Sequence, residues 1–259
     1  MASKRQALIG WKALAAALAA TACMGFSSFS VAPAWVRNAF SLGRADQLHA
    51  IPATAKFSID EGGAFVLDRS GHLALLKFDD SHGDGSEVWV VSPSRGPRGD
   101  ILFKDDVGDI LLRVTKLGGV TVFTSRRPSG LAATLDGKTA RIALPPLGPA
   151  SLYQRMILAS SRCSRATRHL VAFDAPEADA KSAALIADAA LLAMDAIVGV
   201  SSRPAGKAAA AHVTRVTLTK AAKPGVWLQH GVVRISVAPA AGYLGRPSSA
   251  RIAQVIEGS

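Results

Sequence analysis

Cysteine is scarce in this sequence: its 259 residues include only Cys23 and Cys163. A chain this poor in cysteine has no disulfide framework, so its stability has to come from packing. Cys163 lies among three arginines in "SSRCSRATRH", and their positive charge would lower the pKa of its thiol. The sequence supplies no base or orienting group for a nucleophilic cysteine, so we interpret Cys163 as a half-buried structural residue.

Motifs of the common enzymes are also missing. The chain contains no G-x-S-x-G, S-x-x-K or H-E-x-x-H pattern and no two histidines four residues apart, which excludes the usual local signatures of hydrolases and zinc proteases. Gly137-Lys138-Thr139 matches the end of a phosphate-binding loop, but Ala132 occupies the place of the first glycine. We therefore expect no nucleotide and no other cofactor.

Acidic residues are in the minority. The chain has 30 Lys and Arg against 19 Asp and Glu, a formal net charge of +11, and only 6% aromatic residues. The positive charge favours an anionic partner such as an acidic polysaccharide, phospholipid headgroups or an acidic protein surface. Because the basic residues are scattered and no aromatic residues are interleaved with them, we expect no nucleic-acid binding.

No apolar run near the N-terminus is long enough to cross a bilayer. A basic start, "MASKRQALIGWK", precedes the apolar stretch Ala13 to Phe26, which is shorter than the roughly 20 residues of a membrane span. This order is typical of a secretory signal peptide, and Ala32-Pro33-Ala34 has the small-residue pattern of a cleavage site. We predict a signal peptide at residues 1–34 and a periplasmic or envelope-associated chain without a membrane span.

A second cleavage site competes with the first. Ala20-Thr21-Ala22 precedes Cys23, and a cut there would leave Cys23 as a lipidated N-terminus. Bacterial lipoproteins usually carry a larger aliphatic residue where this chain has Ala20, so we favour the cut after Ala34. The alternative is a membrane-anchored lipoprotein that serves in assembly.

Residues 57–148 have the pattern of an antiparallel sheet, after a mixed segment at 35–56 with a short helix at 35–42. β-branched and aromatic runs recur every 8–12 residues between turn formers, as in a β-barrel or sandwich. No linker is long enough for a parallel crossover. The eight expected strands are "AFVLD", "LALLKFD", "EVWVVS", "DILFKD", "ILLRVT", "GVTVFT", "LAATL" and "ARIAL". Side chains such as Phe65, Trp89, Val91 and Leu112 are assigned to the core or the sheet faces.

Residues 149–259 predict a helical segment and a C-terminal β hairpin, in one domain with the β region or beside it. "SLYQRMILASSR" is helix-like, and Pro176 opens a second helix that runs to about Val200. Residues 201–211 are interpreted as a linker. "HVTRVTLT" and "VVRISVA" alternate as strands with a loop between them, and the tail after Pro239 is interpreted as loop. The fold class is therefore α+β.

The stretch "RGPRGDILFKDDVGD" supplies the first candidate site. It combines arginines and acids between two strands, and we select for binding Arg95, Arg98, Asp100, Asp105 and Asp106. The Arg-Gly-Asp tripeptide within it is interpreted as a chance occurrence. Acids at turns also hydrogen-bond local backbone N–H groups, so these residues are either turn formers or a binding rim.

A second acidic loop, "FDDSHGDGSE", is the candidate metal site. Asp80 and Asp84 fall on positions 1 and 5 of a calcium loop, but position 12, which needs a bidentate glutamate, holds Val91. Glu87 would have to substitute for it in another geometry. The competing interpretation is a polar hairpin tip.

Three sequence segments of the β region together resemble the core of a known family. They are "FVLDRSGHLALLKF", "EVWVVSPSRGPRGDILFKDDVGDILLR" and "KLGGVTVFTSRRPSG". The family consists of small exported proteins from alphaproteobacteria with a domain of unknown function, and the likeness covers about residues 57–146. The resemblance implies a Gram-negative envelope location, and it brings no activity, cofactor or catalytic residue.

These observations favour a non-enzymatic binding or structural module of the cell envelope with a basic surface. The alternative is an acid-dependent hydrolase, with or without a divalent metal, that acts on an envelope glycan or a phosphoester. An enzyme would need Asp80 and Asp84 to meet Asp105 and Asp106 in one pocket, whereas a structural module would leave them on separate turns.

Overall fold

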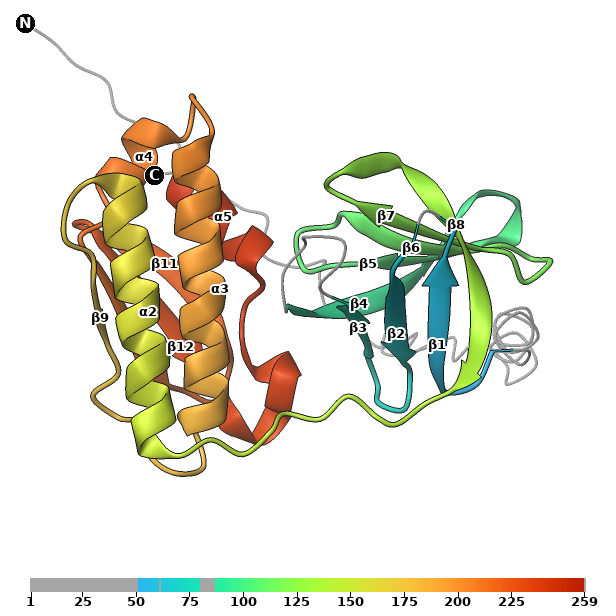
Figure 1. Ribbon diagram of the computed structural model, residues 1–259, viewed down its shortest axis with the longest axis horizontal. Helices are drawn as coiled ribbons and strands as arrows, with labels where there is room; N and C mark the ends of the chain where they lie inside the picture. Colours follow the sequence, from blue (N-terminus) through green and yellow to red (C-terminus); the bar gives the residue numbers. More distant parts are fainter. Residues whose placement is uncertain (1–50, 61, 80–86, 259) are drawn as a thin grey trace, which may run out of the picture. The chain divides into compact units, whose positions relative to one another are not determined.

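Eight antiparallel strands close into a barrel in the computed structural model, which describes residues 51–60, 62–79 and 87–258. Each strand pairs with the next along the chain, and β8 pairs back with β1 (Figure 1). The strands are β1 (Thr54–Ile59), β2 (Ala64–Asp68), β3 (Ala74–Phe78), β4 (Val88–Arg95), β5 (Ile101–Lys104), β6 (Ile110–Val114), β7 (Val120–Thr124) and β8 (Arg127–Lys138). The predicted α+β class and antiparallel architecture are confirmed, and of the two arrangements left open by the sequence, barrel or sandwich, the structure has the barrel.

The barrel forms because its strands alternate between inward apolar and outward side chains. The inward side chains fill the interior, and the rings of Phe57 and Phe65 stack there with centroids 4.8 Å apart. The last strand bends where its register with β7 shifts, and Gly130 has a φ of +86° there. A Cβ at Gly130 would lie 2.6 Å from a methyl carbon of Thr121, so only glycine fits.

Two strand predictions differ from the structure. β1 lies partly within the segment 35–56 that was expected to precede the sheet, while "ARIAL" at residues 140–144 forms no strand. That segment has a strand-like composition but runs as an extended strap after β8. The carboxylate of Asp68 accepts a hydrogen bond from the backbone N–H of Ile142 at 2.9 Å, in place of a ladder of backbone hydrogen bonds.

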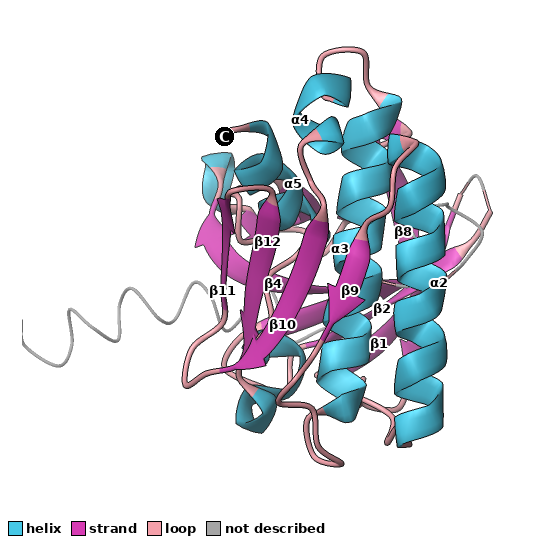
Figure 2. Cartoon of the chain, turned by 90° about the vertical axis from the view of Figure 1, so that its left-hand side faces the viewer, coloured by secondary structure: helices cyan, strands magenta, loops and turns pink. Residues whose placement is uncertain are grey.

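A second, mixed sheet follows the barrel. Its order is β11 (Gly225–Gln229), β12 (Val232–Val237), β10 (Arg215–Lys220) and β9 (Ala172–Asp174), and only the β11–β12 pair is antiparallel. The helices α2 (Pro149–Thr167) and α3 (Ala183–Ser202) pack on one face, where α2 contacts β9 and α3 contacts β10 and β12 (Figure 2). The short helix α4 (Lys207–Ala211), the 3-10 turn η3 (Pro239–Gly245) and α5 (Ser249–Glu257) complete the fold.

Several expected boundaries in this half are corrected. The two predicted strands are neighbours but run parallel, and the segment between them contains β11, which forms a hairpin with β12. The second helix begins at Ala183 rather than after Pro176, because Asp179 forms a local turn in which its carboxylate accepts hydrogen bonds from Lys181 and Ser182. The expected linker and tail contain α4 and α5.

Within the described residues, α3 alone is long and apolar enough to cross a membrane by length and composition. It packs instead against α2, α5 and the sheet, and Leu185, Ile186 and Ile197 on it are almost fully buried. A helix that is apolar nearly all round is typical of a position between two layers of a core.

The barrel core gives a first prediction. Replacing Phe65, which is 1% exposed, by alanine leaves a cavity beside Phe57 and is expected to lower the free energy of unfolding by about 3–5 kcal/mol. The control Leu117→Ala removes a side chain that is 98% exposed and should change stability by less than about 0.5 kcal/mol. Urea denaturation measures both, and equal losses would contradict the packed barrel.

Candidate functional site

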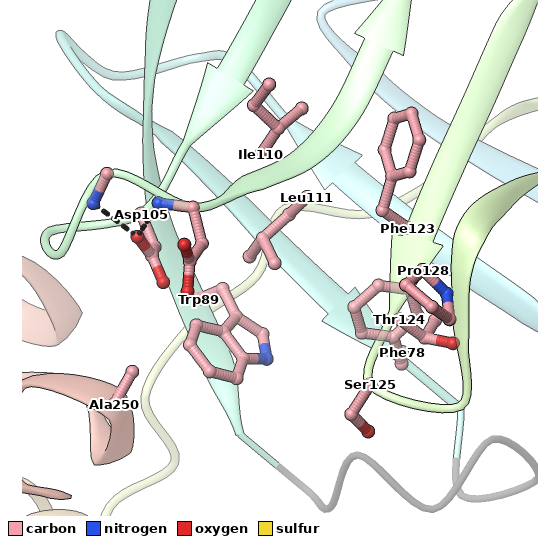
Figure 3. A pocket seen from close by; sticks show the side chains of 12 residues that line it. Phe78, Trp89, Asp105, Ile110, Leu111, Phe123, Thr124, Ser125, Pro128 and Ala250 are labelled. Carbon is pink, nitrogen blue, oxygen red and sulfur yellow. Dashed lines mark hydrogen bonds between the residues drawn. The ribbon is translucent and has the colours of Figure 1, made fainter.

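A recess opens at one mouth of the barrel. It has a volume of about 570 Å³, which lies within the range of small-molecule sites. The walls are largely apolar and the polar groups are few (Figure 3). The lining side chains come from the ends of β3, β4, β6, β7 and β8, the turns beside them and α5, and include Phe78, Trp89, Asp105, Asp109, Ile110, Leu111, Phe123, Thr124, Pro128 and Ala250.

Asp105 follows the last residue of β5 and is only 7% exposed. Its Oδ1 accepts hydrogen bonds from the backbone N–H groups of Val107, Gly108 and Asp109, at 3.1, 2.8 and 2.8 Å. These three bonds fix the carboxylate in one orientation. Within the described part of the chain, no partner is found for its second oxygen, which is available to a ligand in the recess.

Burial raises the pKa of Asp105, and the charge of neighbouring Asp109 acts in the same direction. The backbone N–H groups that Oδ1 accepts from oppose this shift, because they stabilise the ionised form. A partly desolvated carboxylate interacts more strongly with a ligand hydroxyl than a solvated one does. Asp105 is thus a turn former that also lines the recess, and its role in binding stays a prediction.

Trp89 forms one wall of the recess. It lies near the start of β4, paired with Leu76 of β3, and Figure 3 shows the nitrogen-bearing side of its indole turned across the recess toward Phe78 and Ser125. The indole N–H is buried and has no hydrogen-bond partner among the described residues. Since an unpaired buried donor costs about 1–3 kcal/mol, a ligand oxygen that displaces the atoms covering this N–H would recover part of that free energy.

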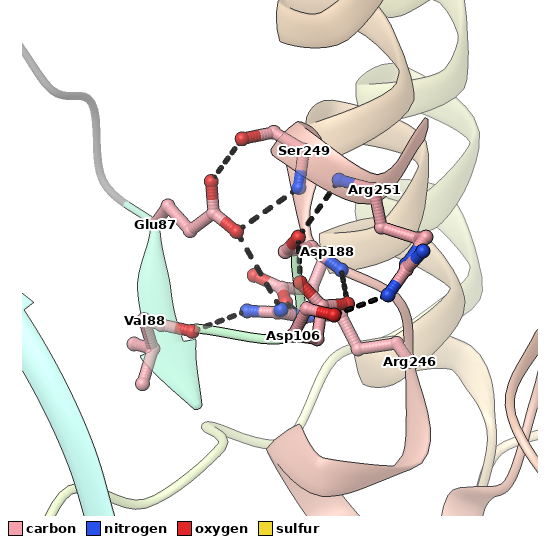
Figure 4. Close-up of polar contacts among 8 residues, drawn as sticks. Glu87, Val88, Asp106, Asp188, Arg246, Ser249 and Arg251 are labelled. Atoms are coloured by element: carbon pink, nitrogen blue, oxygen red, sulfur yellow. Dashed lines mark hydrogen bonds and ion pairs between the residues drawn. The ribbon is translucent and has the colours of Figure 1, made fainter. Parts of the chain in front are cut away.

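Two barrel carboxylates beside the recess cap the first turn of α5 (Figure 4). Glu87 accepts hydrogen bonds from the hydroxyl and the backbone N–H of Ser249, the latter at 3.2 Å. Asp106 accepts from the hydroxyl of Ser248 and, at 3.2 Å, from its backbone N–H. The exposed N–H groups and the positive end of the helix dipole make this turn a favourable place for carboxylates. We call this set, with Arg246 and Asp188, the clamp.

Arg246 lies at the centre of the clamp, with its side chain 1% exposed. It donates to the carboxylate of Asp188 on α3 and, at 2.8 Å, to the carbonyl oxygen of Val88 on β4. Its guanidinium also lies 3.8 Å from Glu87 and 5.6 Å from the centre of the Tyr243 ring. The clamp therefore contains one buried cation, Arg246, and three carboxylates, of which Asp188 and Glu87 lie beside that cation.

Burial raises the pKa of Glu87 to about 7. The charge of Arg246 and the hydrogen bonds from Ser249 oppose this shift, while the charge of Asp188 adds to it. Because Arg246 already donates to Asp188, it neutralises only part of the second negative charge. Glu87 consequently gains and loses its proton near neutral pH.

The other residues selected from the sequence do not converge on the recess. Asp100 accepts a hydrogen bond from Nε of Arg113 at 2.6 Å, and one from the backbone N–H of Lys116 at 3.3 Å. Arg98 is exposed, with a φ of +60° in the 3-10 turn η2 (Pro97–Gly99). Arg95 is exposed near the end of β4. Only Asp105 of the selected five lines the recess, while Asp106 belongs to the clamp.

The metal hypothesis rests partly on residues that the structure does not describe. Asp80 and Asp84 lie outside the described residues, as do Cys23 and the predicted signal peptide and short helix. Glu87 is described, and both of its carboxylate oxygens are engaged by Ser249. Residues 51–60, 62–79 and 87–258 contain no group of three or more His, Cys, Asp or Glu side chains placed to hold a metal ion.

The expectation for Cys163 is corrected. Burial raises the pKa of its thiol to about 12, and Asp195 adds to this shift. The neighbouring arginines point away from the core on the exposed side of α2, whereas Cys163 itself is fully buried. The thiol is therefore protonated near neutral pH, and Cys163 is fully rather than half buried.

Comparison with known families gave a match over most of the chain. A family model described as a domain of unknown function, DUF4908, matches residues 36–256. The chain belongs to this family. The match includes the barrel and the mixed sheet, and so extends well beyond the region that resembled a family core in the sequence. Comparisons with curated proteins and with solved structures gave no match.

Sequence reasoning did not select Trp89, and it selected Glu87 and Asp106 without predicting their contacts with the first turn of α5. Trp89 was assigned to the sheet only because strand patterns do not distinguish a wall of a recess from a packed face. Glu87 and Ser249 are 162 positions apart, so no local motif links them. The "RPSS" run at residues 246–249, with two serines at a helix start, was the available signal for a capped helix.

The clamp gives a prediction about pH. The folded-state pKa of Glu87, about 7, lies above its ordinary value of 4.5, so the folded state binds this proton more tightly than the unfolded state does. The stabilisation of the folded state by this proton is complete when the pH lies below the ordinary pKa of the carboxyl group. It is lost as the pH rises through the folded-state pKa. Between about pH 5 and pH 8 we expect the wild type to lose about 2–3 kcal/mol more stability than Glu87→Gln.

Chemical denaturation at several pH values measures this difference. Asp60→Asn changes an exposed carboxylate of the barrel, and this control should keep the wild-type pH dependence. Parallel curves for the wild type and Glu87→Gln would contradict the assignment of the titrating group.

Proposed function

We propose that this protein is a non-enzymatic binding module of the cell envelope that holds a neutral sugar unit of a glycan at the barrel mouth. One observation carries the proposal: among the described residues neither the Trp89 indole N–H nor the second carboxylate oxygen of Asp105 has a hydrogen-bond partner, and both side chains line the same aromatic recess. Such convergence of a few polar groups in an apolar recess is typical of ligand sites.

A sugar ring matches both polar groups. A hydroxyl group can donate to the carboxylate of Asp105, and an adjacent oxygen can accept from the indole of Trp89. The rings of Phe78, Trp89 and Phe123 supply apolar surface on which the C–H face of a sugar can pack. An organic cation would satisfy Asp105 but leave the buried indole N–H unpaired.

The charge of the recess favours a neutral ligand. Its described lining contains Asp105 and Asp109 but no Lys, Arg or His, so an acidic sugar would meet repulsion without a compensating cation. The net charge of +11 must therefore be carried elsewhere on the chain. There it would attract the chain to an anionic envelope component and raise the local concentration of glycan.

An envelope location is part of the proposal and is supported by the sequence alone. The basic start, the apolar stretch and Ala32-Pro33-Ala34 favour export with cleavage after Ala34, and lipidation of Cys23 is the alternative. The alphaproteobacterial origin likewise stays a prediction. The intact mass of the protein isolated from an envelope fraction distinguishes a chain that starts at Trp35 from one with a diacylated Cys23.

Hydrolysis of the same glycan is the second candidate function. It is favoured by the raised pKa of Asp105 and by the second carboxylate, Asp109, in the same recess, since glycosidases pair a protonated acid with a carboxylate. We prefer binding because Oδ1 of Asp105 is fixed by three backbone N–H groups. A general acid has to exchange its proton with the substrate, and this arrangement favours the ionised form.

Calorimetry with a panel of neutral and acidic oligosaccharides tests the binding function. Asp105→Asn keeps an oxygen for the three backbone N–H groups but replaces the acceptor in the recess, and Trp89→Phe keeps the ring but removes the N–H. We expect binding of a neutral sugar that weakens about 10–100-fold in Asp105→Asn, and by a smaller factor in Trp89→Phe.

Matched controls are Asp60→Asn and Trp227→Phe, which change exposed side chains outside the recess and should bind like the wild type. A reducing-end assay on the same mixtures should show no cleavage, and cleavage that depends on Asp105 would select the hydrolase instead. Sugar binding that survives in both recess variants would contradict the site.

A further inference from the structure

The outward face of α2 combines exposed apolar side chains with arginines. Tyr153, Ile157 and Leu170 are 68%, 51% and 73% exposed, and Leu158 is 40% exposed. These four are half of the large apolar side chains exposed in the described part of the chain. Arg165 and Arg168 lie on the same helix end. We call these six residues the α2 face.

The charge of the α2 face is not balanced locally. Residues 137–173 contain six Lys and Arg and no Asp or Glu. Arg162 has an acid opposite, since its charge lowers the pKa of Asp195 on α3 against the effect of burial. For Arg165 and Arg168, no hydrogen bond or ion pair is found within residues 51–60, 62–79 and 87–258. Two cations are therefore available to a partner.

The surface beside these arginines is hollowed. A recess of about 650 Å³ lies between α2 and β9, with Tyr153, Ile157 and Leu170 at its apolar edge and Ser160 and Ser164 along it. Arg165 also lines it. Tyr153 and Arg168 are 15 residues apart, so the face extends roughly 22 Å along the helix axis.

We propose that the α2 face docks on the surface of a bilayer rich in anionic phospholipid. Charge complementarity selects the occupant: Arg165 and Arg168 meet phosphate groups, while Tyr153, Ile157 and Leu170 enter the headgroup boundary. Basic residues beside apolar and aromatic side chains along one helix face are the general features of interfacial binding. Tyr153, Ile157 and Leu158 lie along α2 and Leu170 follows its end, so the apolar groups at the edge of the recess are spread over the length of the face, which suits a plane better than a peptide.

The docking is tested by co-sedimentation of the full chain with phosphatidylcholine vesicles, with and without about one-third phosphatidylglycerol. We expect binding to the anionic vesicles that decreases with added salt. The double variant Arg165→Glu/Arg168→Glu should bind at least ~10-fold more weakly, since each basic residue near such a surface contributes about fivefold. Tyr153→Ser/Leu170→Ser should weaken binding to the same vesicles and leave its salt dependence in place.

The matched control is Arg126→Glu/Arg234→Glu, which makes the same change in net charge at exposed positions outside the α2 face. It should bind nearly as the wild type does. A thermal melt checks that each variant folds. If the charge-reversal variant Arg165→Glu/Arg168→Glu is unstable, Arg165→Gln/Arg168→Gln is used in its place. Equal weakening by the control, or no weakening by either α2 pair, overturns the proposal. If the wild type does not bind anionic vesicles, the proposal also fails, and an acidic protein is then the partner that fits the charge.

Discussion

The capping of α5 by Glu87 and Asp106 is the contact on which the recess depends. Both carboxylates come from the barrel, and both accept hydrogen bonds at the first turn of the helix. Arg246 completes the clamp from within, and Ala250, one residue after Ser249, forms part of the recess wall. A buried carboxylate is costly unless it is paired, so the helix position and the ionisation of Glu87 are coupled.

Charge is divided between two parts of the molecule. The recess contains two acids and no cation in its described lining, whereas α2 carries arginines and no acid. A strongly basic chain can therefore offer an uncharged ligand a suitable site while its α2 face favours an anionic surface. Both proposals place the protein where glycans and phospholipids occur together, and each depends on different residues.

The barrel was predictable because period-two alternation and short turns report directly on antiparallel pairing. Seven of its eight strands were located, and β1 was missed where it follows a mixed segment. Of the site, Asp105 was predictable as an acid at a turn. The indole of Trp89, the clamp and the unbalanced charge of Arg165 depend on contacts between distant segments, which no local pattern specifies.

The most direct test of the account is the indole N–H signal of Trp89 in a ¹H–¹⁵N NMR spectrum during titration with the neutral sugar that calorimetry selects. The chain has four tryptophans, so the other indoles serve as internal references once each signal is assigned by substitution. We expect a saturable shift of the Trp89 signal together with the backbone amides of Gly108 and Asp109. Shifts centred on Trp227, with Trp89 unchanged, would contradict a sugar site at the barrel mouth.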